Sequence, residues 1–350
     1  MPHFGWYFLT YLIPLVFIAG MITENLVLIW LVPVWMFILT PLLDHFRGVA
    51  TGNVEPEQEN NYTRSIGYNA VVWLWVPFQT LLLLLGLIHV SDLPIASLHF
   101  LALAISAGLI TGAIGITWAH ELCHRTNKIE RAFAEILLCQ VLYAHFAIEH
   151  VYGHHRNVAT PLDPATSRYG QSFYRFLPQT VLGSFLSAWQ IENRQLEKKR
   201  KSFFSFENRM LRYMAIQTLM LVVSFLLFGV SGLVFLIIQS IIAVLLLELI
   251  NYLEHYGLVR QQNSEGRYER VQPWHSWNSS NIISNLSLIN LARHSDHHFI
   301  ASRPYQILRH FDEAPQLPSG YSAMLMLALC PPLWFRIMNP HVKAWRQIYL

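Results

Sequence analysis

The sequence has little charge. Only 13% of its 350 residues are Asp, Glu, Lys or Arg, about half the share that is usual in soluble globular proteins. Hydrophobic residues make up 53% of the chain, and the mean hydropathy is +0.34. The shortage of charge excludes an ordinary soluble protein, and the excess of apolar residues excludes a disordered chain.

Cysteine is also scarce, whereas histidine is abundant. Three cysteines are too few for a disulfide framework, which favours a reducing compartment. The chain has 17 histidines beside only 24 lysines and arginines. An apolar chain with so much imidazole is typical of a membrane protein that holds metal. We therefore expect it to contact membrane lipid and not nucleic acid.

Six segments reach the roughly 20 apolar residues that a membrane-spanning helix needs. They cover about 4–22, 25–43, 69–89, 98–119, 212–229 and 232–250. Pro14, Pro33 and Pro77 fall inside them, which is tolerable where a neighbouring helix bonds the carbonyl that the proline leaves free. The sequence predicts an all-α polytopic membrane protein with six transmembrane helices.

The positions of the basic residues predict which side each loop occupies. If the N-terminus is cytoplasmic, the outer loops are about 20–24, 90–97 and 230–231, and none contains Lys or Arg. This arrangement follows the positive-inside rule, and we expect both termini in the cytoplasm. The expected regions are 1–119 with helices 1–4, a cytoplasmic region 120–211, 212–250 with helices 5 and 6, and a cytoplasmic region 251–350.

Nine histidines are grouped, and two of the groups directly follow predicted spans. The groups are His120 and His124; His150, His154 and His155; His255; and His294, His297 and His298. Residues four apart lie on one face of a helix. His120 with His124, and His150 with His154, are therefore each expected to hold one metal. The other eight histidines are isolated, which is more typical of packing or surface residues.

The ligand type alone does not decide which metal is bound, because imidazole suits zinc, copper, iron and nickel. Residues 120–124 match the HExxH pattern of zinc proteases, but such a site needs only one further ligand and leaves most clustered histidines unused. Nine imidazoles are enough for two metals, and two redox metals with open positions would suit oxygen activation. A metal transporter is a further alternative, although transport sites lie near the middle of the membrane.

Four strings around these histidines resemble the histidine boxes of integral-membrane alkane monooxygenases. They are His-Glu-Leu-Cys-His-Arg (120–125), Glu-His-Val-Tyr-Gly-His-His (149–155), Asn-Tyr-Leu-Glu-His-Tyr-Gly-Leu (251–258) and Arg-His-Ser-Asp-His-His (293–298). The resemblance runs from about 115 to 345. Arg125 stands where the family usually has lysine, and Cys123 and Tyr152 are further departures, but no histidine of the pattern is missing.

The resemblance implies a di-iron enzyme whose two non-haem irons are held by the nine clustered histidines. Such an enzyme would hydroxylate the terminal carbon of medium-chain n-alkanes with O2. Its electrons would come from rubredoxin, which a flavoprotein rubredoxin reductase reduces, and it would lie in a bacterial inner membrane. The alternatives that also have histidine boxes are a xylene-type methyl monooxygenase and a fatty-acyl desaturase or hydroxylase.

Carboxylates beside the boxes are expected to orient the ligands, because a metal-bound histidine usually donates its other N–H to a carboxylate or carbonyl. Salt bridges with cytoplasmic arginines are the alternative for these carboxylates. Cys123 could bind iron as a thiolate, but packing is its expected role. The candidates adjoin or follow ligands: Glu121, Glu149, Asp163, Glu254 and Asp296.

Apolar burial, at about 0.8 kcal/mol per CH2, is the main way to recognise an alkane. We expect its tail to lie between the spans, and Trp35 and Met36 lie roughly 12 Å above the cytoplasmic end of the second span at 1.5 Å per residue. Trp35 or Met36 would limit the length of the alkane that is accepted, if its side chain faces inward instead of toward lipid. Trp30 lies deeper in the same span and is the third candidate. Arg125, Arg156 and Arg293 are candidate contacts for an acidic rubredoxin.

Overall fold

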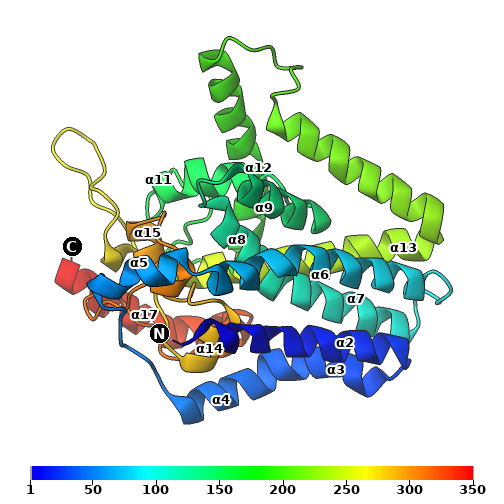
Figure 1. Cartoon of the computed structure of the whole chain (residues 1–350). Helices are drawn as coiled ribbons and strands as arrows, with labels where there is room; N and C mark the ends of the chain where they lie inside the picture. The colour runs from blue at the N-terminus through cyan, green and yellow to red at the C-terminus, as the bar shows by residue number, and fades with distance from the viewer. Residues whose placement is uncertain (1, 350) are drawn as a thin grey trace.

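The computed structural model describes residues 2–349, and these residues form an all-helical protein (Figure 1). No strand occurs among them; the only extended pairings are three isolated bridges, such as that between Val49 and Asn281. The prediction of an all-α fold is confirmed. Buried side chains of most of the long helices join in one hydrophobic core.

Five helices among residues 2–349 are long and apolar enough to cross a membrane. They are Phe4–Ile22, Leu26–Arg47, α6 (Ile66–Val90), Leu98–Cys123 and α13 (Arg209–His255). The first ends in α2 (Leu12–Ile22), and the second runs from α3 (Leu26–Val34) to α4 (Thr40–Arg47). The fourth runs from α7 (Leu98–Ile110) to α8 (Thr117–Cys123). In Figure 1, α2, α3, α6 and α7 run side by side. These helices fit a multi-pass membrane protein, and the first four agree with the predicted spans.

The fifth helix, α13, contains both of the last predicted spans. Its 47 residues are interrupted at Gly229, whose φ of 66° and ψ of −163° are not helical. Glycine adopts positive φ without the penalty that a Cβ brings, and Figure 1 shows the chain changing direction between two helical arms there. The count of six spans, like the side of the membrane on which each end lies, stays a prediction.

Three short π-helical turns interrupt helices that border the histidines or the spans beside them. They are Trp35–Leu39, Thr111–Ile116 and His150–His154. The first follows Pro33, which cannot bond the carbonyl of Ile29 four residues earlier. Ser106 of α7 donates to that carbonyl at 3.0 Å, as expected for a proline inside a membrane helix. Turns of this kind are frequent at functional sites.

Close packing of α7 and its continuation against α13 brings two histidine-bearing helix ends together. A Cβ added at Gly108 would lie 2.7 Å from the carbonyl oxygen of Gln239, and one at Gly112 would lie 2.8 Å from the Cα of Ala243. Two glycines four apart allow membrane helices to approach this closely. The helix that carries His120 and the helix that ends at His255 are thereby held side by side.

Further helical elements carry the other histidines or complete their surroundings. The second box lies on α10 (Phe146–Glu149), the π turn His150–His154 and α11 (His155–Asn157), and the box at 293–298 lies on α15 (His294–Phe299). The helices α9 (Lys128–Gln140) and α12 (Phe173–Lys198) pack against α10, α14 (Ile282–Ser287) packs against α4, and α16 (Tyr321–Ala328) packs against α13. The 26-residue helix α12 was not anticipated from the sequence.

Candidate metal centre

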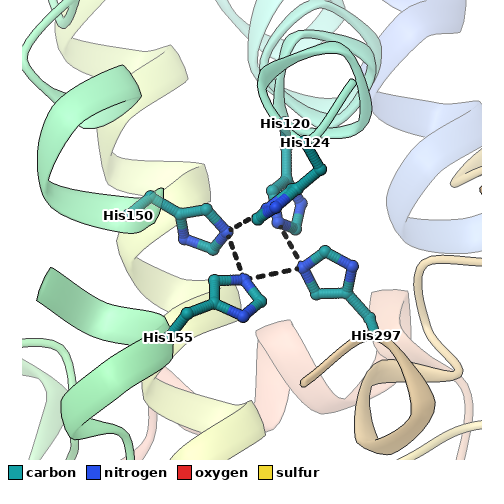
Figure 2. A group of neighbouring side chains, drawn as sticks. All are labelled: His120, His124, His150, His155 and His297. Atoms are coloured by element: carbon teal, nitrogen blue, oxygen red, sulfur yellow. Dashed lines mark hydrogen bonds between the residues drawn. The ribbon is translucent and has the colours of Figure 1, made fainter. Parts of the chain in front are cut away.

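The nine clustered histidines, although spread over 179 positions of sequence, lie together in two groups. The first group takes its rings from α8 and its end, the second box and α15: His120, His124, His150, His155 and His297. Figure 2 shows their rings converging on one point. The second group comprises His154, His255, His294 and His298. Within each group the ligand nitrogens lie within 4.8 Å of one another.

The division between the groups corrects one expectation. His150 and His154 are four residues apart and were expected to hold one metal, yet they fall in different groups. The π turn His150–His154 is the reason, because its wider turn brings His155, five residues on, beside His150, with their Nε2 atoms 3.0 Å apart. The pair of His120 on α8 and His124 at the C-cap of this helix does share a group, as the α-helical spacing predicts.

The separations within the first group fit ligands of a metal and do not fit hydrogen bonds alone. The Nε2 atoms of His120 and His297 are 2.8 Å apart. The Nε2–Nε2 distance is 3.0 Å for each of the next three pairs: His297 with His155, His155 with His150, and His150 with His124. An Nε2 atom has one hydrogen or one lone pair, so the three central rings cannot satisfy two partners each. Nitrogens about 2.1 Å from one ion, at right angles, would lie about 3 Å apart.

The second group has the same donor chemistry with wider spacing. The Nε2 atoms of His154 and His298 are 3.2 Å apart, and those of His255 and His294 are 3.3 Å apart. The Glu254 carboxylate approaches the Nε2 of His294 at 3.2 Å and also accepts a hydrogen bond from the Tyr321 hydroxyl at 2.8 Å. The residues therefore fit two metal ions, with five imidazoles for one and four for the other.

Burial keeps most of these rings neutral, which is the form that binds metal. Burial, followed by the charge of His154, lowers the pKa of His124 to about 3. Burial and then other histidines also hold the pKa values of the following rings well below the usual range: His150, His155, His294, His297 and His298. Burial lowers the pKa of His154 too, but the Asp163 carboxylate beside it outweighs this effect, and the pKa is raised.

The five carboxylates expected to orient ligands have different partners. Asp163 accepts from Nδ1 of His154 at 2.9 Å, the arrangement expected of a residue that orients a metal ligand. Glu121 lies 2.6 Å from an Arg125 nitrogen, and Asp296 accepts from Arg303 at 2.7 Å, so both follow the salt-bridge alternative.

Glu149 and Cys123 also lie close to the ligands. Glu149 is buried and accepts from the Ser187 hydroxyl at 3.3 Å. Cys123 is buried in the core and belongs to neither histidine group, in keeping with packing. The metal roles of the histidines and carboxylates stay predictions.

Two adjoining cavities lead from the membrane helices to the histidines. The inner one, of about 30 Å³, borders His120, His150 and His294. The outer one, of about 320 Å³, lies between the first two spans, α7, α13, α14 and α16. Three residues line both cavities: Ile250, Leu288 and Tyr321. No residue that forms the outer wall within 2–349 is charged.

The three residues expected at a substrate tunnel differ in position. Trp35 and Met36 line the outer cavity. Trp30 is not among the residues of its wall in the described chain and packs against the core. Their effect on chain length stays a prediction.

Some neighbours of the site were not anticipated from the sequence. Asn251 of α13 lines the inner cavity, and Glu248 of the same helix accepts a hydrogen bond from the Asn251 amide. Glu248 is a lone acid in an apolar span, a signal that the sequence does contain. The expected contact with a redox partner at Arg293 is wrong, because this residue is 4% exposed and donates to the carbonyls of Leu308, Ala50 and Gly52.

Comparison with known proteins agrees with this site. The fatty acid desaturase family profile matches residues 96–328. The chain is 44% identical to alkane 1-monooxygenase 2 of Pseudomonas aeruginosa over 90% of this chain and 84% of that protein. It is 41% identical to alkane 1-monooxygenase of Acinetobacter baylyi over 89% of this chain and 76% of that protein. The chain belongs to the alkane 1-monooxygenase family.

Membership of the alkane 1-monooxygenase family identifies the chain as a monooxygenase and removes the zinc protease and transporter alternatives. A more distant relative is the hydroxylase component XylM of xylene/toluene monooxygenase from Pseudomonas putida, which is 33% identical over 70% of this chain and 65% of that protein. The desaturase profile is consistent with a histidine-box metal centre.

Proposed function

We propose that this monooxygenase hydroxylates the terminal carbon of medium-chain n-alkanes, with O2 as co-substrate and electrons from rubredoxin. The observation that carries the proposal is the pair of cavities. An outer cavity of about 320 Å³, with no charged residue in the part of its wall that the structure describes, meets a small inner cavity at the histidines. A hydrocarbon tail gains about 0.8 kcal/mol for each CH2 that it buries, so such a wall suits an alkane.

The narrow inner cavity supports oxidation at the end of the chain. Its volume of about 30 Å³ suits one or two molecules of the size of water, and Ile250, Leu288 and Tyr321 form its shared boundary with the outer cavity. A methyl end fits through such a boundary more easily than a bent or branched chain. The residues of the chain thus bind the tail, exclude water and aim the terminal C–H bond at the metal centre.

The nine histidines would hold two iron ions, and bound iron would supply the activation of O2. Asp163 would keep His154 in the tautomer that presents Nε2 as a ligand, because it accepts from Nδ1. The alternative that XylM represents, oxidation of a methyl group on an aromatic ring, would require the same boundary to admit a flat ring.

The surroundings proposed for the enzyme follow from charge and hydropathy. We infer that it lies in a bacterial inner membrane with 120–211 and 251–350 on the cytoplasmic side, because the basic residues lie in the segments assigned to that side. Rubredoxin and its flavoprotein reductase would then reach the metal centre from the cytoplasm, while the alkane enters from the bilayer.

The test is an oxygen-consumption and product assay on the full-length, iron-loaded protein with octane and reduced rubredoxin. We expect 1-octanol, about two irons for each chain, and loss of both iron and product in His255→Ala but not in His341→Ala. Absence of alcohol from octane in the iron-loaded protein would contradict the proposal. Benzyl alcohol from toluene without octanol from octane would favour the xylene-type reaction.

A further inference from the structure

An acid without a cationic partner lies buried in α13. Glu248 is 1% exposed, and no Lys or Arg bonds to it among residues 2–349. Its hydrogen bonds come from neutral donors: the Tyr143 hydroxyl at 2.8 Å, the Thr180 hydroxyl at 2.7 Å and the Asn251 amide at 3.0 Å. An ionisable residue in a membrane-spanning segment is unfavourable for stability and is typically functional. The nine-histidine ligand set makes no use of it.

Asn251 connects this acid to the inner cavity. Asn251 lines that cavity together with three of the clustered histidines, and Glu248 is the one hydrogen-bond partner of its side-chain amide among residues 2–349. Glu248, Asn251 and His255 follow one another at spacings of three and four, so they share one face of the helix. This polar stripe borders the metal centre on a helix that is otherwise mostly apolar.

An alkane cannot accept a hydrogen bond from the Asn251 amide. A hydrocarbon makes no hydrogen bonds, and a buried polar group is unfavourable unless it has a partner. Glu248 accepts only one of the two N–H bonds of the Asn251 amide, so the partner of the second must be the other reactant or the product, both of which carry oxygen. We propose that Asn251 is a further catalytic residue that donates a hydrogen bond to the oxygen reacting in the inner cavity, and that Glu248 is the positioning residue that fixes its amide.

The proposal rests on the proposed function and has a chemical consequence for it. Hydroxylation combines RH, O2, two electrons from the redox partner and two protons into ROH and H2O. If the oxygen leaves before the C–H bond reacts, the same two electrons and two protons reduce O2 to H2O2. A preorganised donor in a site without bulk water stabilises charge that develops on oxygen. Loss of the Asn251 amide should therefore shift the products from alcohol toward peroxide.

The first experiment measures octanol and H2O2 formed for each O2 consumed by the full-length, iron-loaded enzyme. In Asn251→Leu, which removes the amide at similar volume, we expect the alcohol-to-peroxide ratio to fall about tenfold or more with unchanged iron content. Glu130→Gln is the matched control. Glu130 is also buried and accepts from a neutral donor, Trp73 Nε1 at 2.9 Å, but it lines neither cavity.

A second measurement does not depend on alkane turnover. Nitric oxide, a stand-in for O2, is added to the ferrous protein, and the N–O stretching frequency is recorded by infrared spectroscopy. We expect a shift in Asn251→Leu and in Glu248→Gln, and none in Glu130→Gln. If the wild-type enzyme made no alcohol from octane, the proposed function would fail, while this comparison would still report whether Asn251 donates to a bound diatomic molecule.

A double-mutant cycle tests the link between the two residues. We expect Glu248→Gln to lower the alcohol-to-peroxide ratio in the wild-type background and to add nothing in Asn251→Leu, because residues that act as one unit are not additive. A wild-type ratio and N–O frequency in Asn251→Leu, or loss of iron from that folded variant, would overturn the proposal. If Asn251→Leu does not fold, an unchanged ratio in Glu248→Gln overturns it.

Discussion

At the residue scale, Asp163 has a direct consequence for metal binding. Its carboxylate accepts from Nδ1 of His154 at 2.9 Å and from the Thr166 hydroxyl at 2.6 Å. Such a partner fixes the orientation of the ring and makes it a more basic ligand. We expect Asp163→Asn to weaken metal binding at the second group by about 10–100-fold, as measured by chelator competition. Asp312→Asn serves as the control, because the Asp312 side chain is 97% exposed. Equal affinity in the two variants would show that Asp163 does not support the metal.

Residues also differ in how far their roles could be predicted from sequence. Asp163 was predicted because it follows the second box by only a few positions. Glu121 and Asp296 adjoin ligands in sequence just as closely, but they pair with Arg125 and Arg303. Adjacency along a helix does not fix direction, since neighbouring side chains point about 100° apart. Only the packing of the surrounding elements decides which carboxylate reaches a ring.

At the element scale, hydropathy predicts the helices well, and periodicity assigns the ligands less well. Long apolar runs have few alternatives to a helix in a membrane, so the first four spans agree with the helices of the structure. The division of the second box was not predictable from a 3.6-residue period. The π turn His150–His154 sends His154 to one group and His155 to the other, and no single residue in that stretch signals the extra residue in the turn.

A prediction at this scale concerns the π turn Trp35–Leu39, whose first two residues line the outer cavity. A side chain that meets the end of an alkane limits its length, because overpacking a closed site costs on the order of 1–3 kcal/mol. We expect Trp35→Ser or Met36→Ala to extend oxidation to longer alkanes with medium-chain turnover largely kept, as measured by products over a chain-length series.

Trp30→Ala should leave the series unchanged, because Trp30 is on the same span but outside the cavity wall. Parental product profiles in both cavity variants would place the end of the alkane elsewhere.

At the scale of the whole molecule, the two groups differ in their access to solvent. All four rings of the second group are buried, whereas His124 and His155 of the first group are only partly buried. Arg125 and Arg156 follow these two histidines in the sequence, and Arg156 is exposed. We therefore expect electrons to enter at the first group, next to Arg125 and Arg156.

This arrangement leads to a prediction about electron delivery. Opposite charges on two proteins accelerate their encounter, and salt screens the attraction. With limiting rubredoxin, an acidic carrier, we expect turnover to fall as salt rises from low to physiological. Arg156→Gln should raise the apparent KM for rubredoxin and reduce this salt dependence, while kcat at saturating rubredoxin stays close to the wild-type value.

Arg267→Gln is the control, because Arg267 is 80% exposed and pairs with Glu265. A KM that does not respond to salt would exclude electrostatic steering, and an equal effect of both variants would mean that the net charge of the protein, and not the surface beside His155, attracts the carrier.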